Sequence, residues 1–344
     1  MWQIIGQDRI VSLWQGALAK GSLAHAYLLV GPPHVGKMTL ALNLAQALNC
    51  AREEPPCGEC PSCQKIAAGG HADVQIIGLI QNGNAEAKLI GIDQVKEMQH
   101  TAYLPPFEGR YKVFIIDGAE LLSVEAANCL LKTLEEPVSR VVFILLTTND
   151  SLLLETVVSR CQRLELRPLA VAEVEAALAD RWSVPRPQAE LLARLCHGCL
   201  GWALQATADD SLLRQRDEEL AGLCQLTEAG RGKRIEYALQ LAAQYQQDRA
   251  RVYEVLGLWQ DYWRDLLLIR AGCPEDLVTN VDRRERLQEE ARGYSLAQIR
   301  AFIDGIQASG QQLQLNANPR LVLEVLMMDM PERINGGQDP LYRG

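Results

Sequence analysis

The first half of the chain alternates short apolar runs with segments of helical spacing. Apolar residues recur at helical intervals in 38–48, 93–103 and 123–136. Ser123 suits the N-cap of the last segment, and Pro137 suits its end. The apolar runs are short enough for buried strands, and they are "AYLLV" (26–30), "VQIIGLI" (74–80), "KVFIID" (112–117), "VVFILLTT" (141–148) and "CQRLEL" (161–166). This alternation predicts an α/β domain with a parallel sheet covered by helices on both faces.

From Leu169 onward the strand patterns vanish and helical spacing takes over. Segments 170–182 and 187–208 predict a small helical domain that ends near Asp209. Further helical segments predict an all-α remainder, and they are 237–245, 251–272, 295–315 and 318–330. We therefore expect domains at 1–167, 168–209 and 210–334, followed by a frayed tail at 335–344.

Length and charge narrow the class of protein. A chain of 344 residues is long enough for two or three domains. Its net charge of −9 argues against a large nucleic-acid footprint, so we expect any DNA to be held mainly by partners. No apolar run approaches the ~20 residues of a membrane span, and the N-terminus has no signal-peptide pattern. We expect a soluble, cytoplasmic protein with no membrane partner.

The stretch "GPPHVGK" has the spacing of a phosphate-binding loop, with Gly31, Gly36 and Lys37 at the defining positions. A strand precedes it and a helix follows, as such a loop requires. The next residue normally carries a hydroxyl that ligates magnesium, but here it is Met38, whose thioether is a poor ligand for a hard cation. We also include Thr39 among the candidate residues of this nucleotide site. One step along the helix turns its side chain by about 100° from that of residue 38, so it should not reach the same metal position.

The strand "KVFIID" ends in Asp117, which is placed to support a metal at the same site. In working sites of this kind a Glu often follows and activates water, but this chain has Gly118. Glu120 lies two residues further on and is expected to face elsewhere if a helix starts there, so it does not count as a replacement. The site is therefore expected to bind ATP or ADP weakly, without hydrolysis.

Four cysteines have the spacing of a metal site: Cys50, Cys57, Cys60 and Cys63 in "CAREEPPCGECPSC". Four thiolates leave no open coordination position, so zinc here would be structural. An iron–sulfur cluster would use the same ligands and remains an alternative. Six further cysteines lie in apolar contexts and are expected in the core, at 129, 161, 196, 199, 224 and 273.

Arg160, in "SRCQRLEL", has two interpretations. It is either a solvated surface residue or a cation that projects toward the nucleotide of a neighbouring subunit. Residue chemistry alone does not choose between them.

Taken in order, these motifs resemble the clamp-loader branch of the AAA+ ATPases. The resemblance is dense over 1–167, in "IIGQDRI", "GSLAHAYLLVGPPHVGK", "GIDQVKEMQHTAYLPPFEGRYKVFIIDGAELLSVEAANCLLKTLEEP", "FILLTTND" and "TVVSRCQRLEL". The cysteine module at about 50–63 resembles one in bacterial clamp loaders, and "NANPRLVLEVLMM" resembles the last helix of their collar. The resemblance implies an AAA+ P-loop domain with an inserted zinc module, a helical lid at 168–209 and an oligomerising all-α collar at 210–334.

Within that family the motor subunits, tau and gamma, carry a hydroxyl, a Glu and a lid arginine where this chain has Met38, Gly118 and Gly201. The "SRC" motif is intact, and in that family its arginine, here Arg160, acts in trans on the adjacent subunit. The resemblance implies a subunit without ATPase activity of its own that assembles with tau/gamma and delta. Sliding clamp and primer-template DNA would be reached mainly through that assembly.

Two other functions stay open. A catalytically active tau/gamma-type ATPase is disfavoured by the three losses. A zinc-dependent nucleic-acid-binding module is disfavoured by the acidic balance and by the lack of basic and aromatic residues interleaved around the cysteines.

Overall fold

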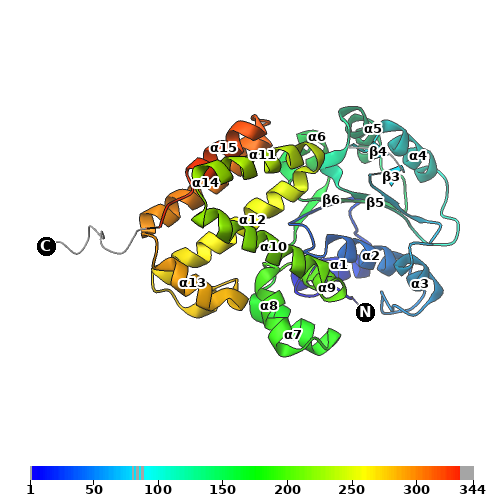
Figure 1. Ribbon diagram of the computed structural model, residues 1–344. Coiled ribbons are helices and arrows are strands. Elements are labelled where there is room, and N and C mark those ends of the chain that lie inside the picture. Colours follow the sequence, from blue (N-terminus) through cyan, green and yellow to red (C-terminus); the bar gives the residue numbers. More distant parts are fainter. Residues whose placement is uncertain (1, 80, 83–84, 87–88, 334–344) are drawn as a thin grey trace. The chain divides into compact units, whose positions relative to one another are not determined.

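The computed structural model describes residues 2–79, 81–82, 85–86 and 89–333, so the tail expected at 335–344 lies outside the described residues. The chain forms two compact units (Figure 1). The first comprises Met1–Val174 and His197–Trp202, and the second comprises Glu175–Cys196 and Ala203–Gly344. The domain boundaries expected after 167 and 209 stay predictions.

The first unit is built on a five-stranded parallel sheet, as the sequence predicts. Its strands are β1 (Ala26–Val30), β2 (Val74–Ile77), β5 (Lys112–Asp117), β6 (Val141–Thr147) and β7 (Gln162–Glu165). They lie in the order β2-β5-β6-β1-β7, and every neighbouring pair is parallel. A separate antiparallel pair consists of β3 (Gln81–Asn82) and β4 (Ala85–Glu86). Because the central strands are parallel, the carboxyl ends of β1, β5 and β6 meet at one edge of the sheet.

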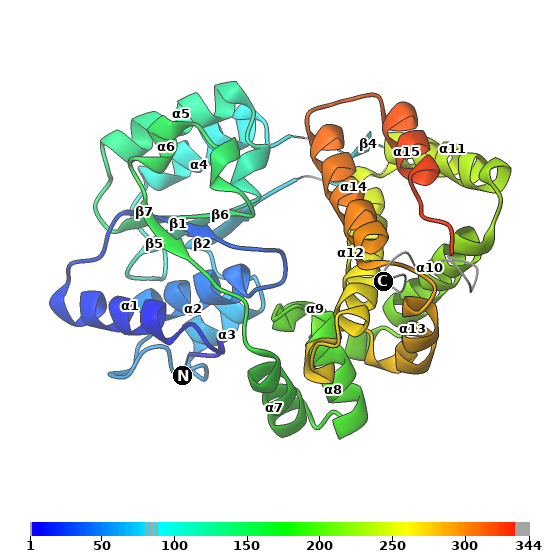
Figure 2. The same ribbon diagram turned by 90° about the vertical axis from the view of Figure 1, so that its left-hand side faces the viewer.

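Helices cover both faces of this sheet (Figure 2). One face carries α1 (Asp8–Lys20), α2 (Lys37–Asn49) and α3 (Pro61–Ala67), and the other carries α4 (Ile92–Ala102), α5 (Val124–Glu135) and α6 (Glu155–Val158). The side chains of β1 alternate between the two cores: Leu29 packs with the α2 side, whereas Leu28 packs with the α4 and α5 side. Ser123 caps α5 by accepting a hydrogen bond from the Ala126 backbone N–H, as expected. Short 3₁₀ turns follow β5 and β6, at η1 (Ala119–Leu121) and η2 (Asp150–Leu152).

Beyond residue 170 every described element is helical, which confirms the loss of strand patterns. Two helices contribute residues to both units: α7 (Val171–Trp182) and α9 (Leu200–Ala208). The second unit otherwise consists of α8 (Arg186–Leu195), α10 (Ser211–Glu228), α11 (Arg231–Gln247), α12 (Arg249–Arg270), η3 (Glu275–Leu277), η4 (Val281–Arg283), α13 (Arg284–Ala291), α14 (Leu296–Gln314) and α15 (Pro319–Met328). None of the described helices combines the length and the apolar character needed to cross a membrane.

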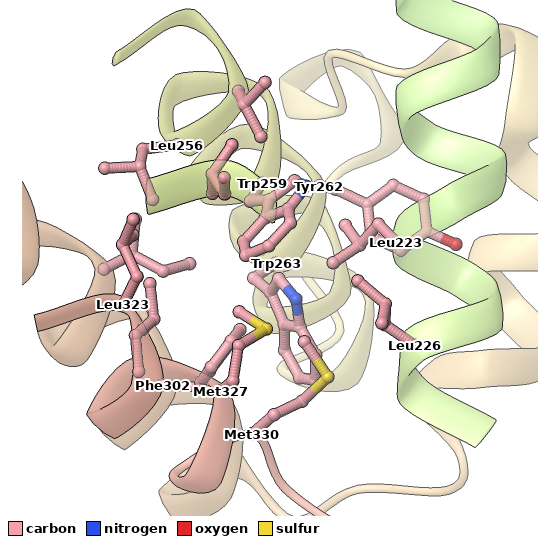
Figure 3. Packing of buried hydrophobic residues seen from close by; sticks show 14 of the residues in the cluster. Leu223, Leu226, Leu256, Trp259, Tyr262, Trp263, Phe302, Leu323, Met327 and Met330 are labelled. Carbon is pink, nitrogen blue, oxygen red and sulfur yellow. The ribbon is translucent and has the colours of Figure 1, made fainter. Parts of the chain in front are cut away.

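The core of the second unit forms around α12 (Figure 3). Trp259 and Trp263 are fully buried on this helix, and Phe302 of α14 packs edge-on against Trp263 with 4.8 Å between ring centroids. Each large side chain buried in this way contributes roughly 1.5–3 kcal/mol. Arg234 is also buried, and its guanidinium donates to the carbonyl oxygens of Leu226, Thr227 and Met330. This arginine therefore ties α11 to the end of α10 and to the segment that follows α15.

Candidate nucleotide-binding and metal sites

A cavity of about 420 Å³ lies in the first unit at the carboxyl ends of β1, β5 and β6. Four of the five residues predicted for the nucleotide site line it, namely Gly36, Lys37, Thr39 and Asp117. The fifth, Gly31, begins the loop and donates its N–H to the Thr147 carbonyl. The structure thus brings the predicted residues to one place, while their role in binding nucleotide stays a prediction.

The loop can wrap around the start of α2 because glycine stands at its last turn. Gly36 is the N-cap of α2 with φ 103°, a conformation that favours glycine. A Cβ atom added there would lie 2.5 Å from Cδ1 of Ile4. The loop therefore delivers the N–H groups of the first turn of α2 to the cavity, which is the usual geometry for binding an anion.

Lys37 bonds back to its own loop. Its Nζ donates to the carbonyl oxygens of Gly31 at 2.6 Å and Pro32 at 2.8 Å. Burial lowers the pKa of the Lys37 ammonium, and the carboxylates of Glu120 and Asp117 oppose that shift. The ammonium is therefore held by the protein's own oxygens.

Met38 stands where a magnesium ligand is expected. Its side chain is half-buried and packs against the hydrophobic core on the α2 side of the sheet, and it also lines the cavity. A thioether is a weak ligand for a hard cation. Thr39 lines the same cavity from the adjacent helical position.

The expectation that Glu120 faces elsewhere is wrong. Gly118 adopts φ 75°, and the chain continues into the tight η1 turn, which carries Glu120 to the same cavity as Asp117. Its Oε1 accepts hydrogen bonds from the backbone N–H of Thr148 at 3.1 Å and from the Thr148 hydroxyl at 2.8 Å. Its Oε2 is buried and has no hydrogen-bond partner among the described residues. Burial raises the pKa of Glu120, but hydrogen bonds from its own backbone, Thr147 and Thr148 outweigh burial and leave the pKa below its ordinary value.

Gly201 approaches the phosphate loop through its backbone. Its N–H donates to the His34 carbonyl at 3.0 Å. A Cβ atom at Gly201 would lie only 2.7 Å from that carbonyl oxygen. This close contact therefore favours glycine, which has no Cβ, at position 201.

The four predicted metal ligands converge. The sulfur atoms of Cys50, Cys57, Cys60 and Cys63 all lie within 4.8 Å of one another. Cys50 directly follows α2, Cys60 caps α3, and Cys63 lies within α3. Backbone N–H groups donate to two of the sulfurs, from Arg52 to Cys50 and from Cys60 to Cys57.

The donor set fits a closed tetrahedral zinc site, since four thiolates would fill all the coordination positions. Hydrogen bonds from the backbone N–H groups of Cys60 and Glu59 lower the pKa of Cys57 to about 6, whereas burial raises the pKa of Cys63 to about 12. Gln46 supports the site by donating to the Cys63 carbonyl at 2.9 Å. Of the six other cysteines, 196, 199 and 224 are buried as expected, whereas 129, 161 and 273 are half-buried.

Arg160 lies just after α6 and outside the lining of the cavity. Its side chain is 35% exposed and pairs with the Glu135 carboxylate at 2.7 Å. It also donates to the Thr156 carbonyl at 3.0 Å. The neighbouring thiol of Cys161 is half-buried, and burial raises its pKa to about 12.

Comparisons with known proteins agree with the motifs. Residues 6–170 match the protein family described as "DNA polymerase III, delta subunit". The DNA polymerase III subunit tau of Bacillus subtilis is 29% identical over 348 residues, which cover 94% of this chain and 60% of that protein. Subunit tau of Escherichia coli is 34% identical over 211 residues, which cover 59% of this chain and 32% of that protein. Subunit delta' of Bacillus subtilis is 26% identical over 327 residues, which cover 95% of this chain and 96% of that protein.

The chain thus spans less than two thirds of either tau protein and nearly the full length of the delta' protein. The chain is therefore similar to the tau and delta' subunits of bacterial DNA polymerase III, and its residues 6–170 match the DNA polymerase III delta-subunit family.

Proposed function

We propose that this chain is a clamp-loader subunit of the delta' type, which hydrolyses no ATP itself and assembles with tau/gamma and delta subunits. Loading of the sliding clamp onto primer-template DNA during replication in the cytoplasm is then the function of the whole assembly. The match to a delta' protein over 96% of that protein's length supports the assignment.

One observation carries the proposal: among the described residues that line the cavity, Met38 stands where a hydroxyl ligand for magnesium is expected, and the carboxylate of Glu120 is already hydrogen-bonded to Thr148. Met38 replaces the magnesium ligand, and Gly118 replaces the residue that activates water. Gly201 offers a backbone N–H to His34 in place of an arginine to the phosphates. The loop then preserves the fold, and ATP or ADP binds weakly without turnover.

Arg160 is proposed to act in trans. Its guanidinium lies outside the chain's own cavity and is partly exposed, so a neighbouring subunit's nucleotide can approach it. An arginine that stabilises developing phosphate charge in this way contributes about 10³–10⁵ in rate.

The remaining parts receive structural roles. The thiolates of Cys50, Cys57, Cys60 and Cys63 would hold one zinc ion and fasten a module too small for a core of its own. Residues 168–209 are proposed as the lid and 210–334 as the collar that joins the subunits, with clamp and DNA contacted mainly through the assembly.

A catalytically active tau/gamma-type subunit is the second candidate. The higher identity to Escherichia coli tau, 34% against 26% for the Bacillus subtilis delta' protein, favours it. That similarity covers only 59% of this chain.

The test separates the two candidates by measuring ATP turnover of the purified chain and clamp loading by the assembly. We expect negligible turnover from the chain alone, and clamp loading only when the chain is added to tau/gamma and delta. Magnesium-dependent turnover by the isolated chain at about 1 per second or faster would favour the tau/gamma type. Full loading without this chain would contradict the delta' assignment.

A further inference from the structure

The cavity contains a carboxylate that the motifs do not anticipate, that of Glu120. We propose that the negatively charged carboxylate of Glu120 occupies the part of the cavity that would receive the phosphates, and that it lowers the affinity of the site for nucleoside triphosphates. This inference rests on the loop of Gly31 to Lys37 being a phosphate loop, and it is independent of the role of Arg160.

The first support is that Glu120 already accepts hydrogen bonds from Thr148, the residue that follows β6. The backbone N–H and the hydroxyl of Thr148 both donate to Oε1, at 3.1 Å and 2.8 Å. Thr148 lines the cavity, so these are two donors that a phosphate oxygen entering there would seek. A phosphate would have to displace the carboxylate to reach them.

The second support comes from Lys37. In loops of this spacing the lysine reaches the outer phosphates. Here its ammonium donates to the carbonyl oxygens of Gly31 and Pro32. The carboxylates of Glu120 and Asp117 oppose the lowering of the Lys37 pKa by burial. The cation that would attract a phosphate is therefore offset by a carboxylate of the same chain.

The third support is the charge of the cavity. Lys37 supplies one positive charge to its lining, whereas Asp117 and Glu120 supply two negative charges. Gly201 adds no cation, and Met38 offers no ligand to a magnesium ion that would shield a phosphate. Each further phosphate adds negative charge beside these two carboxylates, so the electrostatic repulsion is stronger for a triphosphate than for a diphosphate.

The geometry also makes displacement of Glu120 costly. The left-handed Gly118 and the η1 turn aim the side chain at the cavity, and its Oε2 is buried. If the carboxylate swung away, Thr148 would lose both hydrogen bonds and an anion would have to find new partners. A neutral side chain of the same shape at position 120 removes the charge but keeps the space.

The experiment measures Kd for ATP and for ADP, each with magnesium, by calorimetry on the full-length protein purified without chelator. The variant is Glu120→Gln, and Glu125→Gln is the matched control because Glu125 is an exposed glutamate at the start of α5, outside the cavity lining. We expect Glu120→Gln to tighten ATP binding at least about tenfold and ADP binding less, since one repulsive charge is removed near the outer phosphate. Glu125→Gln should change neither.

Two further variants make the result decisive. Adding Lys37→Ala to Glu120→Gln should abolish the gain, since Lys37 is the cation whose charge Glu120 would no longer offset. Glu120→Met, neutral and similar in length, replaces Glu120→Gln if circular dichroism shows that the glutamine variant is unfolded. Equal ATP affinity in the wild type and the folded neutral variant, or no measurable binding by either, overturns the proposal. ATP turnover by the wild type would contradict the proposed function instead, because affinity and hydrolysis are read separately.

Discussion

The guanidinium of Arg160 donates to the carboxylate of Glu135 across 2.7 Å, and the two side chains are 35% and 50% exposed. A cation paired in this way offers less net charge to a phosphate than a free one. Exposed ion pairs contribute about 0.2–1 kcal/mol, so the restraint is weak and reversible.

We predict that Glu135→Gln raises ATP turnover of the assembled complex a few-fold at the site that Arg160 faces. The cause is the loss of a carboxylate that competes with phosphate for the guanidinium. The gain should be largest at low ionic strength, where exposed charges are least screened. Glu136→Gln, at the exposed neighbouring position, is the control. A fall in turnover would instead mean that Glu135 orients Arg160 productively.

The cysteine cluster predicts one bound zinc ion per chain. Cys63→Ser should remove a ligand and reduce the zinc content measured by elemental analysis, because four thiolates are needed to close the site. Hydrogen exchange should then rise in 50–63 more than in the sheet. Cys273→Ser is the control, since this half-buried cysteine lies outside the cluster. Protein purified without chelator that contains neither zinc nor iron would contradict the site.

The glycine at 201 should resist replacement. In Gly201→Ala the new Cβ would lie 2.7 Å from the His34 carbonyl oxygen, so the 197–202 turn must shift and lose its hydrogen bond to the loop. We expect a loss of about 1–3 kcal/mol in unfolding free energy, measured by denaturant titration. Gly222→Ala is the control, because nothing lies within 4 Å of a Cβ there. Equal stability of the two variants would show that the turn adapts freely.

Asp73 should contribute to the pH dependence of the protein's stability in acid through its hydrogen bonds to the 107–109 loop. This buried carboxylate accepts the backbone N–H groups of Phe107, Glu108 and Gly109. Burial raises its pKa, but these three hydrogen bonds outweigh burial, so the pKa lies below the ordinary 3.8. Because the folded pKa is the lower one, the stabilisation is complete above pH 3.8 and is lost as the pH falls through the folded value.

Asp73→Asn should therefore cost about 1–3 kcal/mol at neutral pH and flatten the pH dependence of stability below pH 4. Thermal unfolding across that pH range is the measurement. If the stability of the variant falls below pH 4 as steeply as that of the wild type, the pH dependence arises from other carboxyl groups.

The sheet and the cysteine cluster could be predicted because their signals are local. A strand buried on both faces, such as 141–147, is apolar throughout, and closely spaced cysteines carry their own geometric constraint. The N-cap at Ser123 is also local, since its partner lies three residues away.

The missed parts of the site depend on contacts between distant residues. The direction of Glu120 follows from a left-handed glycine and from hydrogen bonds to Thr148, 28 residues further along the chain. The hydrogen bond between Gly201 and His34 joins backbone atoms, and such bonds between distant residues produce no recognisable sequence pattern. The pairing of Arg160 with Glu135 likewise appears only when α5 and α6 are packed together.

Whether Arg160 serves a neighbouring active site is decided by ATP turnover and clamp loading in a reconstituted assembly that carries Arg160→Ala. The matched control is Arg163→Ala, which removes another partly exposed, ion-paired arginine three positions along the chain. We predict normal folding and assembly for both variants. Arg160→Ala should reduce ATP-dependent clamp loading, with a smaller loss in total ATP turnover because the other ATP sites remain active. Arg163→Ala should behave as the wild type. If the assembled Arg160→Ala complex loads clamps and hydrolyses ATP at the wild-type rate, Arg160 is a surface residue and the trans role is wrong.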